Sequence, residues 1–349
     1  MNKSIVLIFS FILTMTPYAQ EDSIFKIAFG SCAHQNHSIP ILNNVVEHKP
    51  DLFIFLGDNI YGDSKEMDTL RAKYQRLGAK ASYKNLKKNV NIIATWDDHD
   101  FGWNDAGKYY KYKEESKEIF LDFFDVSDSS ERRTHKGIYH SEEYEINGKT
   151  VQVILLDERT FRDDLKYYKG EFKNDTRYFY HLDYAPHSQY DNSTILGKAQ
   201  WKWLENQLLK PADVRIIGSG TQFGIEFNGY ESWANFPGEQ LKFLNLIKST
   251  KANGVLFISG DVHYAEISKM EINNLYPIYD ITSSGLSSTW HFATPNIHRI
   301  EGPVMENHFG LLTINCFKNK PSIKAEIWDI KDNQRIEHTI SLDELKLKE

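Results

Sequence analysis

Short apolar runs alternate with amphipathic segments in the first part of the chain. Runs typical of buried strands cover 25–29, 52–56 and 90–95, and apolar residues recur at helical spacing over 39–47, 66–77 and 110–124. Regular alternation of strands and helices is typical of an α/β domain. We therefore predict an α/β fold for this part of the chain.

The apolar period changes after residue 137. Asn147-Gly148 separates two alternating runs, 137–146 and 150–156, and this dipeptide is a strong hairpin signal. The remaining predicted elements are helices at 197–209 and 239–247 and strands at 214–219, 255–259, 276–281, 310–315, 322–328 and 335–340. Residues 166–194, rich in Tyr, Asp and Asn, are predicted to form a long surface excursion, and such loops are often functional.

The N-terminus has the pattern of a signal peptide. Lys3 precedes an apolar stretch over 5–15, and Ala19 stands near a plausible cleavage point, although Pro17 is unusual there. The stretch is shorter than the ~20 apolar residues that a spanning helix needs. We predict a signal peptide at 1–20, export to the periplasm or the medium, and one catalytic domain over 21–349 with a mixed sheet core.

Composition narrows the function classes. The 349 residues are 41% hydrophobic and 26% charged, as in an ordinary globular protein. The net charge of −7 gives no footprint for nucleic acid. Two cysteines, Cys32 and Cys316, can pair in an oxidising compartment but do not make a disulfide framework.

Polar clusters follow three of the predicted strands. Asp58 and Tyr61 follow the run at 52–56, the cluster 97–100 follows the run at 90–95, and Asp261 and His263 follow the run at 255–259. Carboxylate, phenol and imidazole are ligands for iron or for hard divalent ions. Their recurrence at strand ends predicts one metal site at a sheet edge.

Each cluster also has an ordinary structural interpretation. Asp58 can cap a turn, Tyr61 can be a packed aromatic, and the acidic cluster 97–100 can be a solvated loop. Three carboxylates beside an imidazole would repel one another unless a cation compensates. The clusters together favour the metal site, whereas each alone is weak evidence.

Several motifs resemble known phosphoesterases. The GDNIY sequence at 57–61 matches the GDxxY motif of purple acid phosphatases. FGSC at 29–32, WDDH at 96–99, SGDVH at 259–263 and LDERTFR at 156–162 are similar to motifs of the alkaline phosphatase D (PhoD-like) family of metallophosphoesterases. The resemblance covers about 25–288 and implies the four-layer αββα metallophosphoesterase (calcineurin-like) sandwich with mixed β-sheets.

The resemblance implies an Fe(III) site. Cys32 would bind iron as thiolate, Asp58 would bridge two metals, Tyr61 would bind iron as phenolate and His263 would complete the shell. The alternative for Cys32 is a buried thiol or a disulfide with Cys316. A phenolate on iron would colour the protein.

The resemblance also implies a second metal. Asp98 and Asp261 stand where relatives have nitrogen ligands, and oxygen ligands point to Ca²⁺ over zinc. Asn104 is a further candidate, and so is Gln222, although a turn-forming Asn or a hydrogen-bonding Gln is equally consistent. The family's Asn pair is replaced here by 103–105, which leaves the ligand set of this second metal open.

The implied chemistry is phosphate ester hydrolysis by a metal-bridging hydroxide. Arg159 would grip the phosphate, Arg162 would form a structural ion pair, and His99 would protonate the leaving group or hold a carboxylate. The partner would be a small phosphate ester, and aromatic residues over 167–190 with Trp233 and Trp290 could select its leaving group.

Two alternatives to an alkaline phosphatase remain. One is a secreted phosphodiesterase of phospholipase-D-like specificity. The other is a non-catalytic secreted metal-binding protein, which is disfavoured because closed structural zinc sites prefer Cys and His ligands.

Overall fold

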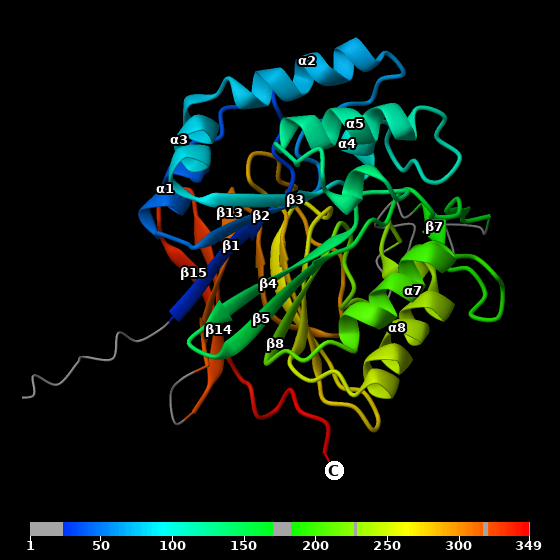
Figure 1. The fold of residues 1–349 in the computed structure, drawn as a ribbon, viewed down its shortest axis with the longest axis vertical. Helices are drawn as coiled ribbons and strands as arrows, with labels where there is room; N and C mark the ends of the chain where they lie inside the picture. Colours follow the sequence, from blue (N-terminus) through cyan, green and yellow to red (C-terminus); the bar gives the residue numbers. More distant parts are fainter. Residues whose placement is uncertain (1–23, 170–182, 227–228, 317–319, 349) are drawn as a thin grey trace, which may run out of the picture.

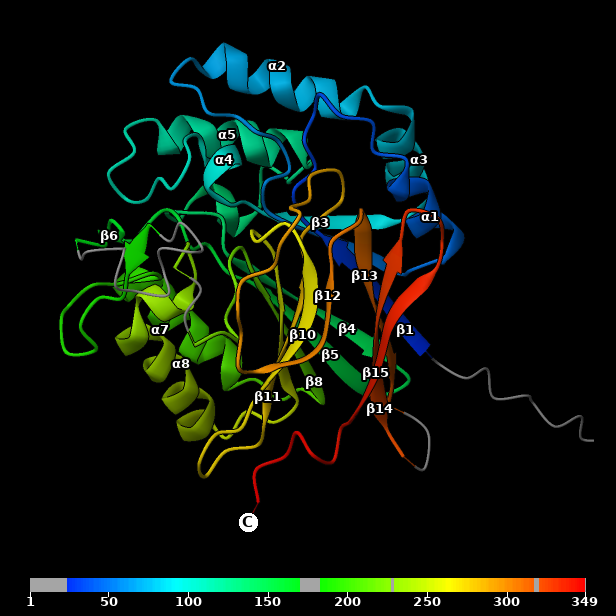
Figure 2. The ribbon, with the colours of Figure 1, turned by 180° about the vertical axis from the view of Figure 1, so that it is seen from behind.

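The computed structural model describes residues 24–169, 183–226, 229–316 and 320–348. Two large sheets pack face to face, and helices cover their outer faces (Figures 1 and 2). Helices α1–α5 lie over the first sheet, whereas α7 and α8 lie over the second. The predicted signal peptide and residues 170–182 of the predicted excursion fall outside the described residues.

The first sheet has the strand order β15-β14-β13-β1-β2-β3. Its strands are β1 (Ile24–Gly30), β2 (Leu52–Leu56), β3 (Asn91–Thr95), β13 (His308–Asn315), β14 (Ser322–Asp329) and β15 (Gln334–Ser341). The helices over it are α1 (Ile41–Glu47), α2 (Met67–Gly78), α3 (Ala81–Asn89), α4 (Asp98–Phe101) and α5 (Lys113–Phe123). Strands β1, β2 and β3 are parallel, so their C-terminal ends meet at one edge.

The second sheet has the order β12-β10-β11-β9-β8-β5-β4. Its strands are β4 (His140–Ile146), β5 (Lys149–Leu155), β8 (Val214–Ser219), β9 (Val255–Ser259), β10 (Ala265–Met270), β11 (Ile278–Ser283) and β12 (Arg299–Val304). The remaining elements are α7 (Gly197–Leu208), α8 (Pro237–Thr250), the short helices η1 (Glu131–Arg133) and η3 (Trp233–Asn235), and the paired β6 (Lys166–Tyr167) and β7 (Tyr184–Ala185). Strands β5, β8, β9 and β11 are parallel.

Strand β2 is apolar at every position because both of its faces are buried. Leu52, Ile54 and Leu56 point into the core shared with the second sheet. Phe53 and Phe55 point the other way, into the core between the first sheet and helices α1–α5. Each fully buried side chain of this size contributes about 1.5–3 kcal/mol. The two packed sheets with helices on both outer faces confirm the predicted four-layer αββα arrangement, and β2 is buried on both faces as this arrangement requires.

Most predicted elements form within a few residues of their expected bounds. The hairpin between β4 and β5 is confirmed, and Asn147 and Gly148 have the positive φ values of 48° and 80° that its turn requires. The prediction missed α3, α4, β10 and β12. Helix α3 buries only Tyr83 and Leu86, too few residues for a periodic signal. Among the described residues, no helix is long and apolar enough to cross a bilayer.

His308 of β13 should make folding stability depend on pH. The Ser284 N–H donates to Nε2 (3.0 Å), Nδ1 lies 2.7 Å from the Glu306 carbonyl, and burial lowers the pKa of His308 to about 4. Below pH 6.5 the unfolded chain binds a proton that the folded protein refuses, so stability should fall by up to about 3 kcal/mol between pH 6.5 and 4.

Urea unfolding at pH 7, 5.5 and 4.5 measures this loss. His308→Gln should remove the His308 part of the pH slope, although it also costs stability at pH 7. An unchanged slope in the variant would contradict the assignment.

Candidate metal centre

The candidate ligands are delivered by the C-terminal ends of parallel strands from both sheets. Cys32 follows β1, Asp58 follows β2, Asp98 follows β3, and Asp261 and His263 follow β9. Ligand atoms of Cys32, Asp58 and His263 all lie within 4.8 Å of one another, although these residues are far apart in sequence. The two sheets therefore bring together the clusters that the sequence placed at strand ends.

The backbone is strained where these ligands lie. Cys32, Asp58, Asp261 and His263 have φ values of 60°, 48°, 72° and 60°, in the left-handed region that residues other than glycine rarely adopt. At Gly57 a Cβ atom would lie 2.4 Å from the Asp97 Cβ, so only glycine allows the two loops to approach. Strain of this kind persists where the surroundings enforce it, and it concentrates at functional sites.

The group formed by Cys32, Asp58 and His263 offers sulfur, oxygen and nitrogen donors. The Cys32 Sγ lies 3.6 Å from Asp58 Oδ2 and 3.2 Å from Ser284 Oγ, and the Tyr61 hydroxyl lies 3.4 Å from His263 Nε2. Cys32 does not pair with Cys316, because both thiols are free. Asn315, the residue before Cys316, pairs with Ile24 at the N-terminal end of β1, whereas Cys32 follows the C-terminal end of this strand. The two cysteines therefore lie at opposite ends of β1.

Further groups are linked to the first by shared carboxylates. Asp58, Asp98 and His99 form one group, and Asp97, Asp98 and Asp261 form another. Asp58 thus belongs to two adjacent groups, as expected of a residue that bridges two ions.

The donor set fits metal ions. Asp58 Oδ1, Asp97 Oδ2 and Asp98 Oδ1 are buried without a hydrogen-bond partner, a costly arrangement unless a cation neutralises them. Burial, together with neighbouring carboxylates, raises the pKa of Asp58, Asp97 and Asp261 well above the usual value. Burial also raises the pKa of the Cys32 thiol. A bound cation would hold these groups in their anionic, coordinating forms.

Arg159 lies behind this cluster and is fully buried. Its Nε donates to Asp97 (2.6 Å), its Nη2 also pairs with Asp97, and its Nη1 donates to Glu231 (2.6 Å). Arg162 pairs with the other Glu231 oxygen at 2.9 Å, which agrees with the structural ion pair expected for it. The phosphate-gripping role of Arg159 stays a prediction, and these contacts instead favour a role in positioning Asp97.

His99 lies beside the cluster, with its ring 4.3 Å from that of Tyr61. Its Nδ1 is 2.8 Å from both Asp63 carboxylate oxygens, so Nδ1 donates a proton to Asp63. Burial alone would lower the pKa of His99, but Asp58, Asp98 and Asp63 outweigh it and raise this pKa to about 11. Asp63 was not predicted, because a lone aspartate in a loop carries no signal.

The side chains of Asn104 and Gln222 form hydrogen bonds outside these groups. The exposed Asn104 amide donates to Asp105 (2.8 Å), and Gln222 donates to Glu266 (3.0 Å) while its buried Oε1 has no hydrogen-bond partner. Asp105 itself forms a fourth acidic group with Asp98 and Glu231. Sequence reasoning missed Asp105 and Glu231, and a metal role for Asn104 stays a prediction.

Asp100 is a scaffold for the Asp58 loop. Its carboxylate accepts backbone N–H groups of Asp97 (2.7 Å), Asp58 (3.2 Å) and Asn59 (3.3 Å), and the hydroxyl of Tyr74 (3.3 Å). It therefore fixes the two ligand-bearing loops relative to each other. The sequence cluster 97–100 offered no way to tell this role from ligation.

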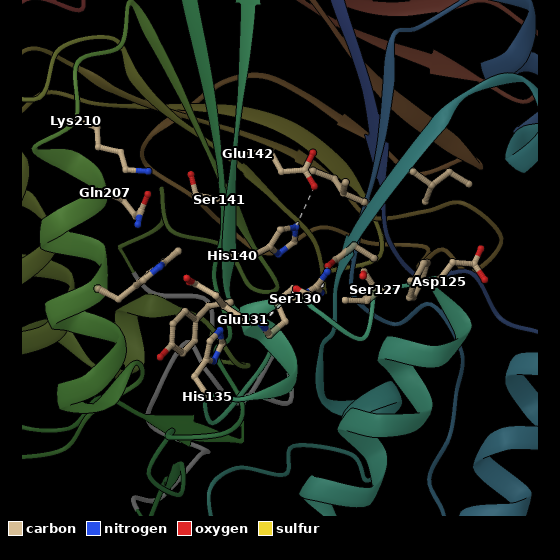
Figure 3. Close-up of a pocket in the computed structure, with 18 residues that line it drawn as sticks. Asp125, Ser127, Ser130, Glu131, His135, His140, Ser141, Glu142, Gln207 and Lys210 are labelled. Carbon is tan, nitrogen blue, oxygen red and sulfur yellow. Dashed lines mark hydrogen bonds and ion pairs between the residues drawn. The ribbon is translucent and has the colours of Figure 1, made fainter.

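A cavity of about 540 Å³ lies elsewhere, where the edge strands β3 and β4 face each other (Figure 3). His135, His140, Glu142 and Gln207 lie along it, and none of its lining residues is a predicted ligand. Trp233, expected to line a substrate cleft, is fully buried and donates to Glu158 (3.0 Å), so that expectation is wrong.

A family model described as PhoD-like phosphatase matches residues 27–329. Alkaline phosphatase D of Bacillus subtilis (strain 168) is 25% identical over 291 residues, which are 70% of this chain and 47% of that protein. This chain thus spans about half the length of that relative. It belongs to the PhoD-like phosphatase family.

Solved structures share the fold at low sequence identity. A structure of PhoD matches 91% of this chain and 72% of its own, with a TM-score of 0.69 and 19% identity. A dimetal phosphatase from Danio rerio matches with a TM-score of 0.55 and 12% identity, over 94% of this chain and 100% of its own. GAP50, described as the anchor in the inner membrane complex of Plasmodium, has a TM-score of 0.53 and 15% identity, with coverages of 94% and 90%.

Proposed function

We propose that this protein is a metal-dependent phosphoesterase that hydrolyses phosphate monoesters, diesters or both at a dinuclear site. The observation that carries the proposal is the set of linked donor groups centred on Asp58 and Asp98, with buried carboxylate oxygens that lack partners. Membership of the PhoD-like phosphatase family supports this reaction class.

The donor types support Fe(III) in one position and Ca²⁺ in the other. Cys32, Asp58, Tyr61 and His263 would hold the iron, because thiolate, phenolate, carboxylate and imidazole together suit a trivalent ion. Asp98 and Asp261 would hold the second ion with Asp58, and oxygen ligands suit calcium. Bound in this way, the ions would polarise the phosphoryl oxygens and lower the pKa of water between them.

His99 would act on the leaving group. Because Nδ1 donates to Asp63, Nε2 is the ring atom that remains to deliver a proton to the leaving oxygen. The hydrogen bond to Asp63 favours the imidazolium form of His99, which would stabilise negative charge developing on phosphate. Asp63 would orient the ring, as the acidic partner of a catalytic histidine commonly does.

Arg159 would act through Asp97 rather than by contact with phosphate. Its guanidinium has no exposed surface, and it holds the Asp97 carboxylate beside Asp98 and Asp261. We also infer export from the signal-peptide pattern of residues 1–20, with a single catalytic domain over 21–349.

Paired assays test the proposal. Purified protein should hydrolyse p-nitrophenyl phosphate or its bis-ester, contain iron and a second metal by elemental analysis, and show a phenolate-to-iron absorption band. Dialysis against a chelator should remove both turnover and colour, and the metals should restore them.

The ratio of the two activities assigns the ester class. Preference for the bis-ester would support the phosphodiesterase alternative, including phospholipase-D-like specificity. Full metal with no turnover on either ester would contradict the proposed function and support the metal-binding alternative. Activity without iron would contradict the assignment of Tyr61.

A further inference from the structure

Three residues of the loop 284–290 hold different atoms of His263. The His263 N–H donates to Ser284 Oγ (2.9 Å), and the Trp290 N–H donates to the His263 carbonyl (3.0 Å). The ring Nδ1 lies 3.0 Å from the Ser288 carbonyl oxygen. Because a carbonyl oxygen only accepts, Nδ1 carries the proton and Nε2 keeps its lone pair for a metal.

The Trp290 indole covers a face of this imidazole. The two ring centroids are 5.0 Å apart and the planes differ by 8°. Phe292 stacks on the Trp290 ring in turn, with the two ring centroids 5.2 Å apart and the planes tilted by 15°, and 42% of the surface of Phe292 is exposed. Tyr230 packs against Trp290 at 5.2 Å. The indole is thereby held between protein groups rather than left free at the surface.

We propose that Trp290 is a positioning residue that fixes the plane of the His263 imidazole for metal binding. The proposal rests on the metal centre of the proposed function. The Nε2 lone pair lies in the plane of the imidazole ring, so tilting the ring would misdirect it away from a bound metal. The hydrogen bond at Nδ1 pins one edge only, whereas the stacked indole blocks the tilt.

The backbone of His263 is also in an uncommon conformation. Its φ of 60° is in the left-handed region, which few residues other than glycine adopt. Groups that orient a ligating histidine commonly change metal affinity by about 10–100-fold when removed. Such groups are usually hydrogen-bond acceptors, and here a flat ring adds a second restraint.

The test compares Trp290→Leu, Trp290→Phe and Phe292→Leu in the full chain loaded with iron. Release of iron into excess EDTA is followed by the loss of visible absorption. Trp290→Leu should release iron about 10–100-fold faster than wild type. Trp290→Phe keeps a flat ring and should stay within about threefold. Phe292→Leu removes the next ring in the series and should match wild type.

A second readout needs no metal. In the metal-free protein, the indole should shift the His263 ring protons upfield in aromatic NMR spectra, and Trp290→Leu should abolish this shift. Equal iron release in Trp290→Leu and wild type overturns the proposal, as does equal loss in Phe292→Leu. Iron release is measured without substrate, so absent turnover with Trp290-dependent release would contradict only the phosphoesterase function.

Discussion

Replacing Asp58 by asparagine should abolish turnover while leaving the fold intact. Asp58 is the carboxylate shared by the group with Cys32 and His263 and the group with Asp98 and His99. The amide keeps the shape but loses the anionic oxygen that both ions would share. Loss of several kcal/mol of transition-state stabilisation corresponds to a fall in kcat/KM of about a thousandfold or more.

The structure indicates that Asp58→Asn should leave the local backbone unchanged and should not lower the stability of the fold. The Asp58 backbone N–H donates to Asp100, the amide oxygen of Asn can still accept from the Cys32 thiol, and Asn tolerates the φ of 48°. Burial also raises the pKa of the Asp58 carboxyl, so the charge is costly in the metal-free protein. In EDTA, Asp58→Asn should therefore unfold at a temperature equal to or above that of wild type.

The measurements are kcat/KM, metal content and the unfolding temperature in EDTA. Asp68→Asn, the same chemical change at an exposed position of α2, should leave all three unchanged. Retention of more than a few per cent of activity in Asp58→Asn would remove this residue from the bridge. Loss of activity together with a large drop in unfolding temperature would instead indicate a structural role.

The sequence was informative where strand ends carry the chemistry. Parallel strands place their C-terminal ends at one edge, so the order of strands and polar clusters could group Asp58 with Asp98. His263 follows β9 of the second sheet and joins them only because the two sheets pack face to face. The burial of β2 could also be predicted from its own residues, because a strand buried on both faces is apolar at every position. The α/β class therefore followed from short patterns, whereas the four-layer αββα arrangement was implied by the resemblance to PhoD-like phosphatases.

Other parts of the site depend on tertiary packing that no local pattern records. Glu231 comes from a loop between β8 and α8, and it meets Asp98 and Asp105 only after both sheets are assembled. Asp98 and Asp100 are two residues apart in one acidic cluster, yet the short helix α4 turns Asp100 toward backbone N–H groups. That turn of helix therefore decides which of the two carboxylates joins the other candidate ligands.

Arg159 is fully buried among ion pairs, and its replacement should be strongly destabilising. Arg159→Met would leave Asp97 buried without its cation, and Glu231 would keep only its ion pair with Arg162. Removing one partner of a buried ion pair costs about 3–5 kcal/mol. Chemical unfolding in EDTA should show this loss, because it precedes any metal or substrate binding.

A second substitution separates this role from contact with phosphate. If the cost comes from an uncompensated carboxylate, Arg159→Met combined with Asp97→Asn should recover part of the stability, so the two changes should be non-additive. If Arg159 instead grips phosphate, Arg159→Met should keep wild-type stability and raise KM. Arg159→Lys should fall between wild type and Met, because one ammonium cannot span Asp97 and Glu231 as the guanidinium does.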